Sequence, residues 1–146
     1  MSRRTSIILA LSEIFKGIDG TTPYKINIYG NSYPKLKFWD EVQDFPSVYM
    51  SPGSEAREYL PGDFKWGYLN VSIKAYVRDE DYAHERLEEL LGDLETCIDA
   101  NRTLLYDSDN NLRITDIMIQ QITTDEGLLA PYGVGEINLQ VRYALE

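Results

Sequence analysis

The strongest constraint on the fold is a regular alternation of apolar and polar residues in two long stretches. Between Phe64 and Arg78, one parity carries apolar side chains, namely Leu69, Val71, Ile73, Ala75 and Val77. The stretch from Glu136 to Leu145 alternates in the same way, with apolar Ile137, Leu139, Val141, Tyr143 and Leu145. Successive side chains of a strand point to opposite faces, so both stretches are predicted to be long, half-buried strands.

Two other segments have helical periodicity instead. Residues 7–18 carry one apolar stripe, made by Ile7, Ile8, Leu11, Ile14, Phe15 and Ile18. Residues 79–101 place leucines on one face and acidic residues on the other, which predicts the most regular helix of the chain. Asp79 and Asp81 favour its N-terminal end, and Asn101 is suited to stop it.

The remaining elements are less regular. Alternation over residues 24–30 predicts a strand. Prolines and glycines in residues 30–63 predict short strands, one of them at 48–50, separated by long loops, with a projecting hairpin or arm around 52–62. The apolar parity changes near Asp116, which predicts a bulge or a sharp twist there. GVGE at 133–136 is interpreted as a flexible start of the last strand rather than a phosphate loop.

The order of helix, strands, helix and strands predicts the α+β class. We expect a single domain over residues 1–146, with an antiparallel or mixed, twisted sheet and two main helices packed on one face. The other face would then carry the semi-polar residues Tyr68, Tyr76, Asn138 and Gln140. A face of that kind suits contact with another protein.

The candidates for chemistry have simpler interpretations. His84 is the only histidine and lies on a charged helix face, while Cys97 lies on the apolar face and is interpreted as a buried hydrophobe. Asp107, Asp109 and Asn111 have part of a calcium-loop spacing, but the positions for its glycine and glutamate hold Leu112 and Met118. We therefore predict no catalytic, cofactor or metal site, and no enzyme.

The formal net charge of −10 would repel a phosphate backbone and argues against tight binding to nucleic acid. It is compatible with a passage whose acidic lining lets DNA slide without sticking. The apolar run at 7–11 is too short to span a bilayer, and Glu13 and Lys16 follow it, so no membrane association is predicted.

Three stretches together resemble the tail terminator (tail completion) proteins of long-tailed bacteriophages. They are YMSPGSEAREYLPGDFKWGYLNVSIKAYVR, DYAHERLEELLGDLETCID and ITDIMIQQITTDEGLLAPYGVGEINLQVRY. The resemblance covers roughly residues 47–145. It implies a structural virion protein of the tail and neck, assembled in the host cytoplasm as a hexameric ring. Such a ring caps the tail tube, ends tube polymerisation and joins the tail to the head.

The partners implied by the resemblance are further copies of the chain, the tail tube protein and a neck or head-completion protein, with a sheath protein where the tail contracts. Genome DNA would pass through without sequence-specific binding. The candidate interface residues come from the arm, the outer sheet face and the loop before the last strand: Arg57, Tyr59, Leu60, Phe64, Trp66, Tyr68, Tyr76, Glu126, Leu128, Tyr132 and Arg142.

Three alternatives stay open from the sequence. Each aromatic candidate could pack locally under its own loop instead of contacting a partner. The chain could be a head-completion or neck connector protein, which shares this size and the habit of forming rings. It could also be a non-enzymatic ligand-binding or regulatory α+β domain with a closed apolar pocket.

Overall fold

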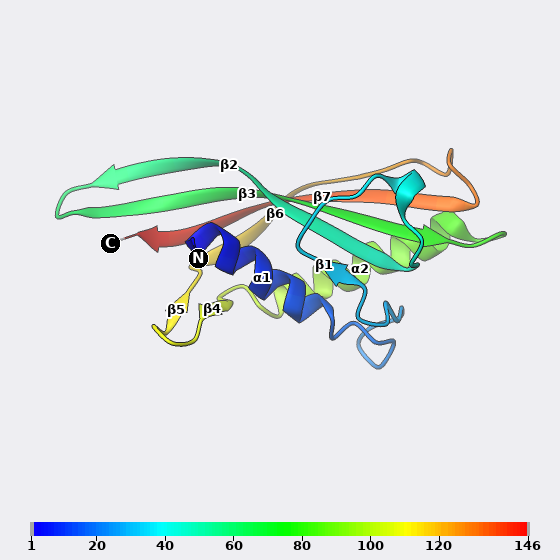
Figure 1. Cartoon of the computed structure of the whole chain (residues 1–146), viewed down its shortest axis with the longest axis horizontal. Coiled ribbons are helices and arrows are strands. Elements are labelled where there is room, and N and C mark those ends of the chain that lie inside the picture. The colour runs from blue at the N-terminus through cyan, green and yellow to red at the C-terminus, as the bar shows by residue number, and fades with distance from the viewer. Residues whose placement is uncertain (1, 146) are drawn as a thin grey trace.

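The computed structural model describes residues 2–145 and consists of a twisted β-sheet with helices below it (Figure 1). Helices α1 and α2 are joined by strands and by one short 3-10 helix, η1. The elements in chain order are α1 (Arg3–Phe15), β1 (Ser32–Tyr33), η1 (Trp39–Glu41), β2 (Ser47–Leu60), β3 (Phe64–Arg78), α2 (Ala83–Asp99), β4 (Leu105–Asp107), β5 (Leu112–Arg113), β6 (Asp116–Thr124) and β7 (Tyr132–Leu145).

The main sheet has the strand order β1-β2-β3-β7-β6, and β4 and β5 form a separate two-stranded sheet. Only β1 is parallel to its neighbour; the other pairs of the main sheet are antiparallel. Strand β7 follows β3 as far as the pair Lys65 and Leu145, whereas β6 begins opposite Arg142. The β2–β3 hairpin therefore extends past the end of β6, as Figure 1 shows.

Both helices pack on one face of the main sheet, which confirms the predicted α+β class and layer arrangement. Helix α1 supplies Ile7, Leu11 and Phe15 to this core, and α2 supplies Leu87, Leu90 and Leu94, all fully buried. The apolar parities of β3 and β7 meet them from the sheet. The apolar residues of both strands are buried on the face that the alternation predicted. A shift of the strand register by one residue would move all of these side chains to the solvent face, so the alternation fixes the register.

The two long strands and the second helix form where the sequence predicted them. Asp79 Oδ1 accepts hydrogen bonds from the backbone N–H groups of Asp81 and Tyr82, which orders the chain just before α2. At the other end, Asn101 Nδ2 donates to the carbonyl oxygen of Cys97 at 2.8 Å. Polar side chains thus satisfy backbone groups at both helix ends.

The strand predicted at residues 24–30 is wrong. This segment makes a single isolated bridge, between Asp19 and Asn27, and otherwise follows an irregular path. Its backbone N–H groups at Lys25 and Ile26 donate instead to the carboxylate of Asp93, at distances of 2.8 to 3.1 Å. The apolar alternation correctly predicted that Ile26 and Ile28 are buried. The backbone of this segment, however, forms hydrogen bonds with a side chain of α2 instead of with a neighbouring strand.

The expectation of only short strands between residues 30 and 63 is also wrong. Strand β2 is continuous over 14 residues and includes the predicted short strand at 48–50. It tolerates Pro52 because it lies toward the sheet edge, where β1 pairs only with Val48 and Tyr49. A register shift between Pro52 and Glu55 absorbs the irregular PGS sequence.

The parity change near Asp116 comes from a break between β5 and β6, and the bulge lies further along, between Ile119 and Gln121. The glycines of GVGE are explained by packing rather than by flexibility. A Cβ atom on Gly133 would lie 2.7 Å from Val77 Cγ2 and 2.9 Å from the Ala83 carbonyl oxygen. Helix α2 lies so close to β7 that a side chain at this position would clash with it.

Candidate protein-interaction site

The segment for which the sequence predicts an arm forms the distal half of β2 and the following turn. We call residues 55–69 the hairpin arm: β2 and β3 pair there from Glu55 with Leu69 to Leu60 with Phe64. The turn contains Gly62 and Asp63, both with positive φ, which closes the hairpin tightly. Tyr59 and Leu60 near the tip are 74% and 41% exposed, so the hairpin arm presents apolar surface to solvent.

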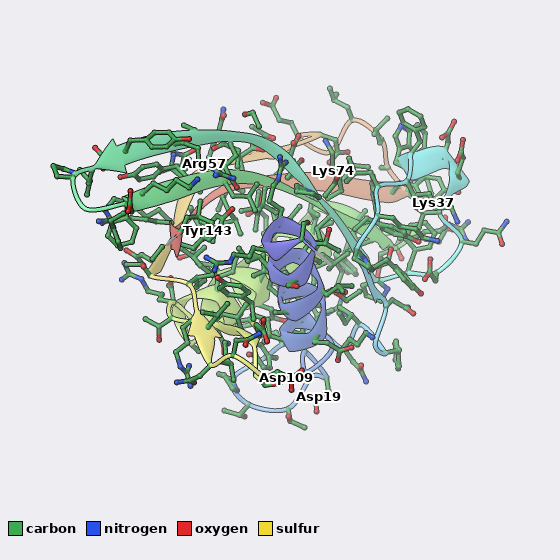
Figure 2. All side chains as sticks on the ribbon, turned by 60° about the vertical axis from the view of Figure 1, so that its left-hand side comes forward. Asp19, Lys37, Arg57, Lys74, Asp109 and Tyr143 are labelled. Carbon is green, nitrogen blue, oxygen red and sulfur yellow. The ribbon has the colours of Figure 1, made fainter. Side chains whose placement is uncertain are left out.

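The helix-facing side of the hairpin arm is held by a polar cluster. Tyr143 of β7 donates its hydroxyl hydrogen to Glu55 Oε1 at 2.6 Å, and Arg57 Nε donates to Glu55 Oε2. The Glu55 side chain is only 4% exposed, so this carboxylate needs both donors. Burial, followed by the hydrogen bond to Glu55, raises the pKa of Tyr143 above its ordinary value. Figure 2 shows Arg57 and Tyr143 at this end of the sheet.

Glycine 67 lies directly over this cluster. A Cβ atom at Gly67 would lie 2.7 Å from Tyr143 Cε1 and 2.9 Å from Tyr143 Cζ. The Tyr143 ring also meets Tyr106 edge-on, with ring centroids 6.3 Å apart. The ring is therefore packed between the hairpin arm and β4, and the base of the arm is a fixed part of the sheet.

Four candidate residues gather on the outer face, the sheet face opposite the helices. Phe64 and Trp66 meet edge-on with centroids 5.0 Å apart, and the Arg142 guanidinium lies 3.9 Å from the centroid of the Trp66 ring. Tyr68 is the direct neighbour of Arg142 across the β3–β7 pair and donates its hydroxyl hydrogen to Glu58 at 3.1 Å. This group combines aromatic rings with arginine, the side chains enriched at protein interfaces.

Arg142 has spare hydrogen-bonding capacity within residues 2–145. Its Nε atom is buried and has no hydrogen-bond partner there, and its guanidinium forms no ion pair in that range. Nearby Asp116 is bound by Arg102, whose Nε and Nη2 both donate at 2.9 Å. Arg102 thus satisfies Asp116, and Arg142 keeps its charge over the Trp66 ring, where cation–π attraction stabilises it.

The opposite end of the outer face is covered by the chain itself. Residues 34–46 fold over it and form a second apolar cluster, in which Tyr76 is only 3% exposed and donates its hydroxyl hydrogen to the Lys37 carbonyl oxygen. Tyr132 lies against Trp39 and Phe45, with ring centroids 5.5 and 5.7 Å away. Tyr76 and Tyr132, two of the eleven candidates, therefore pack within the subunit, beneath residues 34–46 rather than under their own loops.

The loop between β6 and β7 is well ordered yet leaves one leucine in solvent. Asp125 Oδ2 accepts from Leu129 N–H at 2.9 Å, and Asp125 Oδ1 accepts from Val134 N–H at 3.3 Å. These bonds fix a turn from which Leu128 projects, 84% exposed, beside exposed Glu126. An ordered loop loses little conformational entropy when a partner covers it, so Leu128 is suited to a contact.

A further apolar patch was missed by the sequence reasoning. Phe38 is 75% exposed and Leu36 is 49% exposed, and a pocket beside them is lined by Trp39, Lys74, Tyr76 and Val134. The signal was present in KLKFW, where two large apolar residues alternate with lysines inside a proline-bounded loop. Met118 and Ile122 of β6, each 41% exposed, were missed as well because they belong to a strand whose parity shifts.

The residues considered as catalytic or metal-binding candidates, His84, Cys97 and Asp107, make only local contacts or are buried in the core. His84 Nε2 lies 3.7 Å from Glu88 on the surface of α2, and burial raises the pKa of the Cys97 thiol. Asp107 accepts two hydrogen bonds from Asn110 within its own turn. Among residues 2–145, no three His, Cys, Asp or Glu side chains come together as a metal site would require. Neither helix in this range is long and apolar enough to cross a bilayer.

The sequence profile of a family described as Bacteriophage Tail Tube Terminator Protein matches residues 1–146. The chain belongs to this family. This confirms the resemblance found in the sequence and extends it from residues 47–145 to the whole chain.

Proteins similar to this terminator family member include one from a bacteriophage and one from a gene transfer agent particle. The chain is 39% identical to the tail tube terminator protein p142 of Escherichia phage T5, over 98% of this chain and 94% of that protein. It also shares its fold with a chain in the virion of a native gene transfer agent particle. That match has a TM-score of 0.64 at 8% identity and covers 99% of this chain and 100% of the other.

Proposed function

We propose that this chain is a structural, non-enzymatic virion protein that assembles into a closed hexameric ring, caps the tail tube and ends its polymerisation. The observation that carries this proposal is the 39% identity to a named tail tube terminator over nearly the full length of both proteins. Similarity that extends end to end includes the surfaces as well as the core. A shared assembly role is therefore favoured over a shared fold alone.

The surface features support contacts with several proteins. The hairpin arm exposes Tyr59 and Leu60 near its tip, and the β6–β7 loop exposes Leu128. On the outer face, Phe64, Trp66 and Tyr68 of the arm lie beside Arg142 of β7. These patches lie on different elements, so one subunit can touch ring neighbours and a tube or neck protein together. Rings require contacts between different patches of successive copies, because a self-complementary patch closes a dimer instead.

The acidic charge is consistent with the route that genome DNA would take. A net charge of −10 repels the phosphate backbone and leaves DNA free to move through a ring. We place the protein at the junction of tail tube and neck, where it would also join the tail to the head. A head-completion protein would be the partner on that side, and a sheath protein would join it in a contractile tail.

Mass photometry of the protein alone and mixed with polymerised tail tubes, followed by negative-stain images of tube ends, tests this function. We expect a ring at one end of each tube and no further growth of capped tubes. A matched pair of variants tests the arm: Leu60→Asp should reduce capping, whereas Leu9→Asp on α1, where the leucine is similarly exposed, should not. Compact monomers that never bind tubes would favour the neck-connector alternative.

A further inference from the structure

Strand β6 is an unprotected edge of the main sheet. It is the last strand in the order β1-β2-β3-β7-β6. Within residues 2–145, no other strand pairs with the edge of β6 that points away from β7. Its sequence from Ile117 to Thr124 contains no charged residue, proline or glycine. Protein sheets ordinarily block exposed edges with lysine, proline or a covering segment, because a free row of N–H and C=O groups pairs with other strands. Only the bulge near Gln120 interrupts this edge.

The opposite edge of the same sheet is also largely free. Strand β1 pairs with β2 only at Val48 and Tyr49. From Met50 to Leu60, the edge of β2 that points away from β3 therefore has no strand neighbour in the described chain. The part of this edge before the register shift holds obstacles that β6 lacks. Pro52 cannot donate to a ladder, and the Arg4 side chain binds the Gly53 carbonyl group. Past the register shift, residues 55–60 form a regular edge again.

The strand directions make these two edges compatible. Strands β2, β3, β7 and β6 alternate in direction, so β2 and β6 run opposite to each other within one subunit. Rotation about a ring axis keeps the direction of every strand relative to that axis. The β6 of one copy therefore meets the β2 of the next copy in antiparallel orientation, which continues the pattern of the sheet.

The position of the hairpin arm along the strand direction also favours this pairing. Asp116, the first residue of β6, stands level with Arg142 and Tyr68, whereas the hairpin arm continues to Phe64. Pairing residues 55–60 with β6 therefore requires a shift along the strands from one copy to the next. A sheet that closes on itself needs tilted strands and a shift in register between them. Because the arm extends beyond the start of β6, pairing it with β6 of the next copy produces such a shift.

From these observations we infer that β6 of one subunit pairs antiparallel with residues 55–60 of β2 in a second copy of this chain. The sheet would then continue from subunit to subunit around the ring and leave no free edge. This inference rests on the proposed ring. The rival, a two-fold pairing of β6 with β6, is also antiparallel, but it closes a dimer and leaves both β2 edges unused.

Disulfide cross-linking tests the pairing directly, since the chain has one cysteine, Cys97, which is buried. Single cysteines are placed on the outer face of β6, at Met118, Gln121 or Thr123, and on the arm by Glu58→Cys. A disulfide needs Cα atoms within about 7 Å, so only neighbouring strands become linked. On rings seen by electron microscopy, we expect a mixed disulfide between the arm cysteine and one of the three β6 cysteines.

A variant that carries both cysteines of the linked pair should give a ladder of covalent oligomers on a non-reducing gel. Disulfides between two β6 cysteines, or rings without any mixed disulfide, would overturn the pairing while the ring itself stands. If no ring forms, either alone or on tubes, the proposed function fails instead. A blocking pair adds a control: Thr123→Lys on the edge should abolish rings, whereas Thr96→Lys on α2 should leave them intact.

Discussion

The Tyr143 hydroxyl donates a hydrogen bond of 2.6 Å to Glu55 Oε1, across 88 positions of sequence, and so joins the last strand to the base of the hairpin arm. Arg57 donates to the other oxygen of the same carboxylate. A carboxylate that is almost fully buried is costly unless both oxygens are satisfied. This contact therefore fixes the base of the arm relative to β7 and gives any partner a preformed surface.

Removing that hydroxyl should destabilise the protein. Tyr143→Phe keeps the ring but leaves one oxygen of Glu55 without its donor, so we expect the free energy of unfolding in urea to fall by about 1–3 kcal/mol. Tyr106→Phe is the matched control, because its hydroxyl makes no hydrogen bond within the described residues and its ring touches the same Tyr143 ring. Equal effects of the two changes would contradict a special role of the bond to Glu55.

Two glycines should respond to alanine with opposite signs. Gly133→Ala would push a methyl group against Val77 and the backbone of Ala83, so we expect a loss of about 1–3 kcal/mol in stability. Gly92→Ala in α2 meets nothing within 4 Å and should raise stability by about 0.5–1 kcal/mol, because alanine favours the helix. Thermal unfolding of both variants checks the signs, and a tolerated Gly133→Ala would contradict the tight contact between α2 and β7.

The sheet centre should contribute a pH-dependent stability. Glu136 accepts hydrogen bonds from Lys74 Nζ at 2.8 Å and Ser72 Oγ at 2.7 Å, and the bond from Lys74, more than that from Ser72, lowers the pKa of Glu136 below its ordinary value of 4.5. A lowered folded-state pKa means that the stabilisation is present above pH 4.5 and is lost as the pH falls through the folded-state value.

Glu136→Gln should therefore cost up to about 1 kcal/mol at neutral pH, a value limited by the partial exposure of both partners. The difference from the parent protein should vanish as the pH is lowered below the folded-state pKa. Urea unfolding between pH 3 and pH 7 measures this, with Glu95→Gln on α2 as the charge-matched control. A constant difference at all pH values would show that the carboxylate does not act through its charge.

Asp93 shows how far local patterns predict this fold. The alternation in residues 24–30 correctly reported that Ile26 and Ile28 are buried, but it could not report that the backbone there binds an aspartate of α2 instead of a strand. Strand β3 was predicted over its whole length and β7 from Glu136 onward, because each lies inside the sheet with one face buried along its length. Hydrogen-bond partners far away in sequence leave no local pattern.

Replacing Asp93 should release that segment. Asp93→Asn keeps the shape but weakens the acceptor for the amides of Lys25 and Ile26, so we expect a loss of about 1–3 kcal/mol. Hydrogen exchange should become faster at those two amides and stay unchanged in β3. Asp99→Asn, on an exposed position of the same helix, is the control. Unchanged exchange at Lys25 and Ile26 would mean that the carboxylate does not hold the segment.

The interaction surface was harder to predict than the core. Exposed residues of the hairpin arm show no apolar alternation, so the sequence indicated a projecting segment but not that β2 runs unbroken into it. Only the structure separates the aromatic candidates into two groups. Phe64 and Trp66 lie together on the outer face, whereas Tyr76 and Tyr132 pack into the apolar cluster beneath residues 34–46. Composition identifies side chains suited to interfaces, but only the fold decides which of them remain free.

Leu128 offers the cleanest separation of assembly from stability. It is 84% exposed on a loop that Asp125 holds in place, so Leu128→Asp should leave thermal unfolding unchanged. If a ring or tube contact buries this side chain, the new charge would be desolvated there, and we expect at least about tenfold weaker binding. Capped tube ends counted over a range of protein concentrations provide the measurement. Tyr29→Asp, at a position 74% exposed in the segment before β1, is the control, and equal capping by both variants would remove Leu128 from the interface.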